Sequence, residues 1–294
     1  MRKALPSVLS EVSAILLCFV AAGLTRGFDT AFEAFGSMLW GAIGDWPRFF
    51  ETGNAATVLR PLGESATKAA ILTFTGLSVT VAFRVGLFNI GAQGQLMVGA
   101  LAAAVVGAKL ALPAPLHVTL ALLASAAMGA LWALGPALLK LKRGVHEVIS
   151  TIMLNWVAIS LVENWLVVGP LRAQSSGGNS VSGTDEILES AMLPRLLGDA
   201  SRLHLGFVLA VIAAVGTWYF LTRFVRGFEW RVIGLSADAA RASGIEVERG
   251  LLRAMLLAGA FAGLGGATLI LGTEFKYPAT LGAPWGFDGI AMAL

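Results

Sequence analysis

The chain alternates between long apolar stretches and short segments that carry most of its polar and charged residues. A helix that crosses a membrane needs about 20 largely apolar residues. Stretches of this kind predict seven membrane spans, at 8–25, 66–84, 86–107, 116–139, 146–168, 204–222 and 250–272. A further apolar stretch begins at Gly286 and is still apolar at Leu294, so we expect an unfinished eighth span in a chain that is truncated or continues.

The composition supports a membrane protein. Of the 294 residues, 56% are hydrophobic and only 13% are charged, and the mean hydropathy is +0.77. An ordinary soluble domain has about 25% charged residues, so a chain this apolar could not cover its own surface in water. Disorder is excluded for the same reason. We therefore expect an all-α, polytopic integral membrane helical bundle that forms a single transmembrane domain over residues 1–294.

The basic residues predict how the bundle is oriented. More than half of the 21 lysines and arginines lie at the amino end, in 140–147 and in 222–253, whereas the longer segments 26–65 and 169–203 carry few. Such an excess marks the cytoplasmic side, so we expect the amino terminus to be cytoplasmic. The first span follows Arg2 and Lys3 without a convincing cleavage site, which favours a retained helix over a signal peptide. The net charge of +3 is too small to indicate nucleic-acid binding.

Two segments on the outer side differ in character. Residues 26–65 include an apolar stretch, 31–44, that is too short to span and that we expect along the outer surface or dipping into it. Residues 169–203 are rich in Ser, Gly and Pro, as in 175–178, and predict an exposed outer loop.

Polar side chains interrupt the apolar sequence at the junction of the second and third spans. Asn89, Gln93 and Gln95 lie among glycines there, and Asn155 lies two turns inside the fifth span. An unpaired polar group in hydrocarbon costs several kcal/mol, so these side chains should face other helices or a water-filled path. The glycines allow a broken helix, which transporters use to present backbone groups to a substrate. Polar side chains that merely join helices are the alternative.

The basic segment 223–249 contains a short alanine-rich helix, predicted over 234–245. Ser236 can cap its start, Asp238 suits the first turn and Gly244 can end it. Ala239 and Ala240 should present a small, smooth surface from which Arg241 projects. Two turns are unstable alone, so a partner holds this helix or it is a packed connector.

The remaining polar and small residues have structural interpretations. Adjacent residues on a helix point to different sides, so His146 and Glu147 do not form an acid/base pair. Glu163 lies towards the outer end of its span, where pairing or snorkelling explains it. Gly259 and Gly263 are one turn apart and favour close helix packing.

One cysteine and three histidines exclude a cysteine metal cluster and disfavour zinc. No phosphate loop or catalytic motif occurs, so we expect no enzyme, cofactor or metal.

Four segments together resemble one family. Residues 86–95, 144–155, 234–245 and 286–291 resemble, in order, signatures of the permease subunits of nucleoside-type ABC importers, which belong to the wider group of ribose and branched-chain amino-acid permeases. The similarity covers about residues 60–294. Two positions depart from the family pattern: Gln93 stands where Glu is usual, and His146 where Asn is common. Relatives also continue through further spans.

The resemblance implies an assembly in the bacterial inner membrane. Its parts are this permease, a second permease subunit that is identical or homologous, cytoplasmic ATPase subunits and an external substrate-binding protein, often a lipoprotein. It implies that the segment around 234–245 docks on the ATPase through Gly234, Ser236, Asp238, Ala239, Ala240, Arg241, Ser243 and Gly244. For a polar, uncharged solute such as a nucleoside or sugar, we expect path residues at Asn89, Gln93, Gln95 and Asn155.

Two other functions remain open. An ion-coupled secondary carrier needs a titratable group buried in mid-membrane, and only Glu163 comes near that position. A membrane scaffold that transports nothing would copurify with no ATPase.

Overall fold

The computed structural model describes residues 5–173, 183–198 and 201–294. These residues are nearly all helical, and their only β-type pairings are isolated bridges such as Arg172 with Thr184. The described residues form two compact units. One consists mainly of the helices before Ser65, and the other of Ala66–Leu196 with Arg202–Leu294.

The first unit is built from short helices. It contains α1 (Leu5–Arg26), α2 (Phe28–Ile43), α3 (Trp46–Thr52) and the start of α4 (Ala56–Arg84). Phe19 of α1 packs edge-on against Phe32 of α2, with 4.8 Å between the ring centroids. Asp45 begins α3 by accepting a hydrogen bond from the Arg48 amide.

The segment 26–65 is mostly helical. The apolar stretch 31–44 lies mainly in α2, and α4 begins ten residues before the predicted span at 66. Gly27 and Gly44 have positive φ angles of 93° and 96°, and they turn the chain sharply between one helix and the next. Each glycine therefore separates two helices, and the position of 31–44 along the outer surface stays a prediction.

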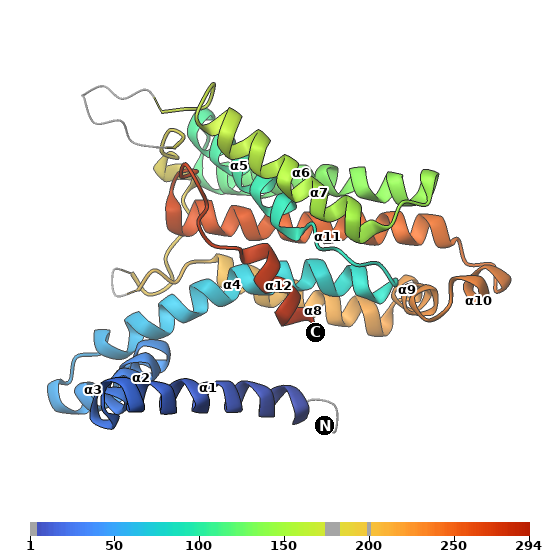
Figure 1. Cartoon of the computed structure of the whole chain (residues 1–294). Helices are drawn as coiled ribbons and strands as arrows, with labels where there is room; N and C mark the ends of the chain where they lie inside the picture. The colour runs from blue at the N-terminus through green and yellow to red at the C-terminus, as the bar shows by residue number, and fades with distance from the viewer. Residues whose placement is uncertain (1–4, 174–182, 199–200) are drawn as a thin grey trace. The chain divides into compact units, whose positions relative to one another are not determined.

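The second unit holds the remaining helices, shown in Figure 1. After the rest of α4 come α5 (Ala92–Lys109), α6 (Ala114–Arg143), α7 (Glu147–Leu161), α8 (Gly206–Arg223), α9 (Val225–Leu235), α10 (Ala237–Ala242), α11 (Val247–Leu269) and α12 (Trp285–Ala293). Both α7 and α11 continue into a π-helical turn, at Val162–Val167 and Ile270–Glu274.

Five helices of the described chain are long and apolar enough to cross a membrane. They are Ala56–Arg84, Ala114–Arg143, Glu147–Val167, Gly206–Arg223 and Val247–Glu274. Each contains or largely overlaps one predicted span. The predicted spans 8–25 and 86–107 coincide with α1 and α5, which are helical but are not among these five. An all-helical chain with several helices of spanning length is thus confirmed.

The centre of the second unit is a contact between backbones. Gly263 of α11 lies against the Ser125 carbonyl and Gly129 of α6, and Gly259 lies against the Gly129 carbonyl. The Ser125 hydroxyl donates a hydrogen bond of 2.6 Å to the Gly263 carbonyl. On another side of α11, Gly266 touches the Leu96 carbonyl of α5. The prediction of a close-packing face at Gly259 and Gly263 is confirmed, because these glycines bring the backbones of α6 and α11 together with only small side chains, such as those of Ser125 and Ala133, at the contact.

The segment 169–203 is more than the exposed loop that its composition predicted. Ile187, Ala191 and Leu193 are buried in the same cluster as residues of α5 and α11. Backbone amides along it donate to the carbonyls of Gly107, Phe275 and Leu271. The Ser/Gly-rich residues 175–178 lie outside the described residues. Residues 183–193 are therefore a packed cover over the ends of α5 and α11.

We predict that Gly263→Ala destabilises the protein. An added Cβ would meet the Ser125 carbonyl, and overpacking of this kind costs about 1–3 kcal/mol. The matched control is Gly216→Ala in α8, where a Cβ meets nothing within 4 Å. Thermal unfolding of the purified proteins in detergent should show a lower midpoint for Gly263→Ala alone; equal midpoints for both variants would contradict the contact.

Candidate functional site

The junction of α4 and α5 is a true helix break. α4 ends at Arg84 and α5 begins at Ala92, and Gly86 between them has a φ of 79°. A Cβ on Gly86 would lie 3.5 Å from the Gly234 Cα of α9. The glycines allowed a broken helix without deciding it, and the structure shows that the predicted span 86–107 is helical only from Ala92, with the break lying against α9.

Asn89, within the break, forms a reciprocal pair with Gln95 of α5. The Asn89 amide donates to Gln95 Oε1 at 2.9 Å, and the Gln95 amide donates to Asn89 Oδ1 at 3.0 Å. Asn89 Nδ2 also lies 3.0 Å from the Ser78 hydroxyl of α4. Both amide side chains are buried. The pair therefore satisfies polar groups that would otherwise be costly inside the protein.

Asn155 fastens α7 to the same break. Its Oδ1 accepts a hydrogen bond of 2.9 Å from the Gly94 amide, which is one of the amides without a helical partner in the first turn of α5. Its Nδ2 donates to the Ile90 carbonyl at 2.8 Å. Gln93 points elsewhere, and its Oε1 accepts from the Gly286 amide at the start of α12 at 2.7 Å.

The four predicted path residues thus divide into two groups. Asn89, Gln95 and Asn155 gather around the break, whereas Gln93 joins α5 to α12. All four side chains are buried and bonded within the protein. These contacts fit the interpretation that polar side chains join helices, and a role in a path stays a prediction.

The segment 234–245 is not one helix, and Gly234 lies outside the short helix that the sequence predicted. It belongs to the last turn of α9, where it approaches the Arg84 carbonyl so closely that a Cβ would not fit. The start and end of α10 follow the prediction. Ser236 Oγ accepts from the Ala239 amide at 3.2 Å, and Gly244 ends the helix with a φ of 79°.

The two alanines of α10 face in opposite directions. Ala239 is exposed, whereas Ala240 is completely buried in the cluster that includes Ile233 and Val247. The expected smooth surface of Ala239 with Ala240 is therefore wrong for Ala240, because the short helix uses this side chain to pack on its own protein.

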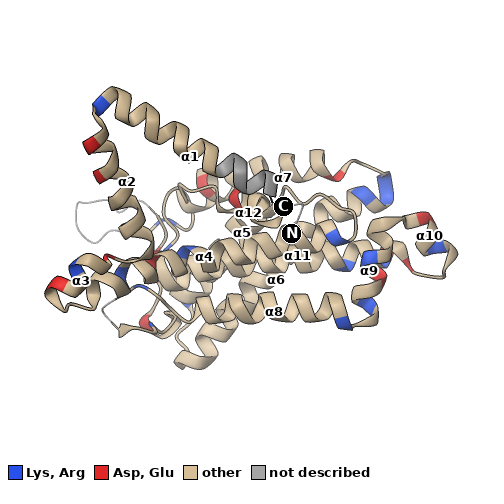
Figure 2. Cartoon of the chain, turned by 90° about the horizontal axis from the view of Figure 1, so that it is seen from below, with Lys and Arg blue, Asp and Glu red and all other residues tan. Residues whose placement is uncertain are grey.

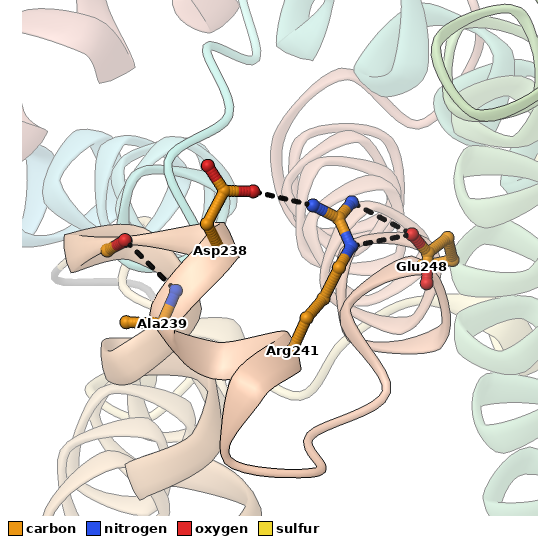
Figure 3. Close-up of polar contacts among 5 residues, drawn as sticks. Asp238, Ala239, Arg241 and Glu248 are labelled. Carbon is orange, nitrogen blue, oxygen red and sulfur yellow. Dashed lines mark hydrogen bonds and ion pairs between the residues drawn. The ribbon is translucent and has the colours of Figure 1, made fainter.

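Arg241 does not project freely, as Figure 3 shows. Its guanidinium lies 3.1 Å from Asp238 Oδ1 within α10 and 2.9 Å from Glu248 Oε1 in the first turn of α11. The hydrogen bond from Arg241 lowers the pKa of Glu248, and the same bond raises the pKa of Arg241. Both groups are charged at neutral pH, so this ion pair links α10 to α11.

Other titratable groups inside the second unit have structural partners. Lys140 at the end of α6 lies 2.8 Å from Glu147 at the start of α7, and Glu163 accepts a hydrogen bond from the Leu281 amide. His204 is fully buried, and its Nδ1 accepts a hydrogen bond of 3.1 Å from the Gly206 amide. Among the described residues, no group of three or more His, Cys, Asp or Glu side chains could hold a metal ion.

Comparison with known proteins identifies the family. The family described as branched-chain amino acid transport system / permease component matches residues 62–294. That range contains the helix break, Asn155 and α10. The chain belongs to this family.

Several curated relatives of this chain are ABC transporter permeases. A guanosine ABC transporter permease protein of Bacillus subtilis is 43% identical over 79% of this chain and 66% of its own length. A glucose ABC transporter permease protein of Haloferax volcanii is 36% identical over 79% of this chain and 63% of its own. A nucleoside ABC transporter permease protein of Lactococcus lactis is 32% identical over 80% and 66%. No solved structure matches the chain significantly.

The chain spans slightly less than two thirds of the length of these three relatives. The family match over residues 62–294 includes the whole second compact unit, and the helix break, α10 and α11 lie in it.

We predict that Asn89 and Gln95 stabilise the protein as a pair. Asn89→Leu and Gln95→Leu should each cost about 1–3 kcal/mol, because each leaves a buried amide without its partner. The double variant should cost clearly less than the sum of the two, since neither amide is then left unpaired. Unfolding in detergent measures the three values, and strict additivity would show that the pair does not act as a unit.

Proposed function

We propose that the chain is a transmembrane permease subunit of an ATP-driven ABC importer for nucleosides or related sugars. The observation that carries the proposal is the family match over residues 62–294 together with relatives whose names specify guanosine, glucose and nucleosides. In this proposal the chain performs no covalent chemistry, and ATP is hydrolysed on separate subunits. It works beside a second permease subunit and receives its solute from an external binding protein.

The orientation follows from the distribution of charge. Lysines and arginines gather at the end of the second unit that carries α9 and α10, as Figure 2 shows. Under the positive-inside rule, this end is cytoplasmic, and the basic residues Arg2 and Lys3 independently favour a cytoplasmic amino terminus. We propose seven spans and the start of an eighth, all within one permease domain of the bacterial inner membrane.

The polar groups at the helix break would form part of the solute path. Asn89, Gln95 and Asn155 offer neutral donors and acceptors, which suit the hydroxyl and amide groups of a nucleoside or sugar. In the described conformation they bond to the protein itself. Opening a path there would exchange these bonds for bonds to the solute. At Gln93, opening would instead break the hydrogen bond that its side chain accepts from the Gly286 amide. The solute would then bind these groups weakly enough to be released from the path.

Coupling to the ATPase would pass through α10. Its exposed surface, which includes Ala239 and Ser243, is free to dock, while Ala240 and Arg241 fix the helix to α11. A displacement of α10 would therefore be transmitted to α11, whose Gly259 and Gly263 lie directly on α6. Nucleotide binding can shift the permease between two states only through contacts that differ between those states.

The direct test compares ATP-driven with ion-coupled uptake. In membranes that contain this chain, uptake of labelled guanosine should continue when the proton gradient is dissipated and ATP is kept high. Purification of the chain should bring an ATPase with it. Uptake that stops with the gradient would favour the secondary carrier, and an inactive chain without an ATPase would favour the scaffold.

We predict that the Arg241–Glu248 pair matters for transport more than for stability. Exposed ion pairs contribute up to about 1 kcal/mol, so Arg241→Gln and Glu248→Gln should each lower uptake by up to about fivefold. The double variant should be no worse than either single variant, because both remove the same link. The control is Lys109→Gln, which breaks an exposed pair with Asp185 far from α10 in the sequence. If uptake falls equally in the control, the effect is not specific to α10.

A further inference from the structure

A pocket beside α9 is lined partly by charged residues that neither the proposed path nor α10 uses, and partly by Ser243 and Gly244, which the resemblance assigns to docking on the ATPase. It has a volume of about 500 Å³ and lies between α9 and the segment that leads into α11. Arg226 and Glu229 line it from α9, and Arg249 and Arg253 line it from α11, with Glu246 at the helix start. Glu246 pairs with Arg249 at 2.6 Å. The remaining charges are therefore two arginines and one glutamate, which leaves the pocket net positive.

An apolar stripe runs along α9 next to this pocket. Val225, Phe228, Val232 and Leu235 recur at helical spacing, and all except the half-buried Val232 are exposed. The opposite face of the helix, with Gly227, Trp230 and Ile233, is buried. Val225, Phe228 and Leu235 are thus each more than half exposed, whereas Val232 also packs against the core of the protein. Val225 belongs to the stripe and also lines the pocket, so the two surfaces are continuous.

Aromatic and basic side chains surround the stripe. Trp218 and Tyr219 are exposed near the end of α8, and Phe224 is exposed at the turn into α9. Arg231 lies over the Phe228 ring at 5.9 Å from its centroid. Tryptophan and tyrosine collect where a membrane meets water, and amphipathic helices with arginines and exposed aromatic residues lie in that same layer. This arrangement indicates that α9 lies along the membrane surface.

We propose that the pocket binds the phosphate of an anionic phospholipid whose acyl chain covers the stripe on α9. Arg226 and Arg253 would hold the phosphate, since guanidinium groups match phosphate oxygens. Basic pockets between helices at the cytoplasmic surface are suited to anionic lipid headgroups. An acidic segment of a partner protein would satisfy the arginines but would leave the apolar stripe without an explanation, so the lipid fits both surfaces. The proposal does not depend on the transported solute.

The test measures how the purified full chain retains lipid. Native mass spectrometry in a mild detergent would compare phosphatidylglycerol with phosphatidylcholine of the same acyl chains. An arginine near an anionic surface contributes about fivefold to binding, so Arg226→Gln with Arg253→Gln should lower phosphatidylglycerol retention by more than about tenfold. Both side chains are exposed, and circular dichroism would show that the variant folds.

The matched control removes the same charge elsewhere. Lys142→Gln with Arg143→Gln changes two exposed residues at the end of α6, outside the pocket, and should keep the preference for phosphatidylglycerol. Equal losses in both double variants, or no loss in the pocket variant, would overturn the proposal. Displacement of the lipid by inorganic phosphate alone would overturn it in favour of a free anion. Loss of a copurifying ATPase with lipid retention unchanged would assign the pocket to the ATPase instead.

Discussion

The second unit depends on how closely its helices approach one another. In a membrane the lipid tails are as apolar as the helices, so burial of apolar surface gives helices little reason to associate. Contact between backbones supplies that reason through dispersion and short polar contacts. Gly259 and Gly263 of α11 lie directly on Ser125 and Gly129 of α6, and Gly266 lies on α5. These contacts make α11 the helix against which its neighbours are positioned.

A second constraint is that buried polar groups need partners. The helix break at 85–91 removes backbone hydrogen bonds in the middle of apolar sequence, and amide side chains replace them. Asn155 bonds to both Ile90 and Gly94, and Gln93 bonds to Gly286. Asn89 and Gln95 satisfy each other. The break is therefore stable as built, and the same groups are the ones that a polar solute could compete for.

The end of the unit with α9 and α10 connects these features to the surface. α10 is too short to be stable alone, and it is held by Ala240 in the core and by the pair between Arg241 and Glu248. Because Glu248 lies in the first turn of α11, movement of α10 in the proposed coupling would reach the central helix through this side chain and through the packing of Ala240. α9 lies beside this link and buries its other face against the bundle. A lipid bound at α9 and a protein bound at α10 would thus act on adjacent parts of one structure.

The sequence by itself determined the all-helical class, the glycine face at Gly259 and Gly263, and both ends of α10. Each of these depends on local spacing or on the conformation of one residue, which the sequence contains directly. Only the tertiary structure decided that Ala240 is buried beside an exposed Ala239, that Arg241 reaches Glu248, and that Gln93 faces α12 while its neighbours face α7. The spacing of residues along one helix determines the face on which a side chain lies. The neighbour that the side chain meets there belongs to a segment distant in the sequence. Gln93, for example, bonds to the amide of Gly286.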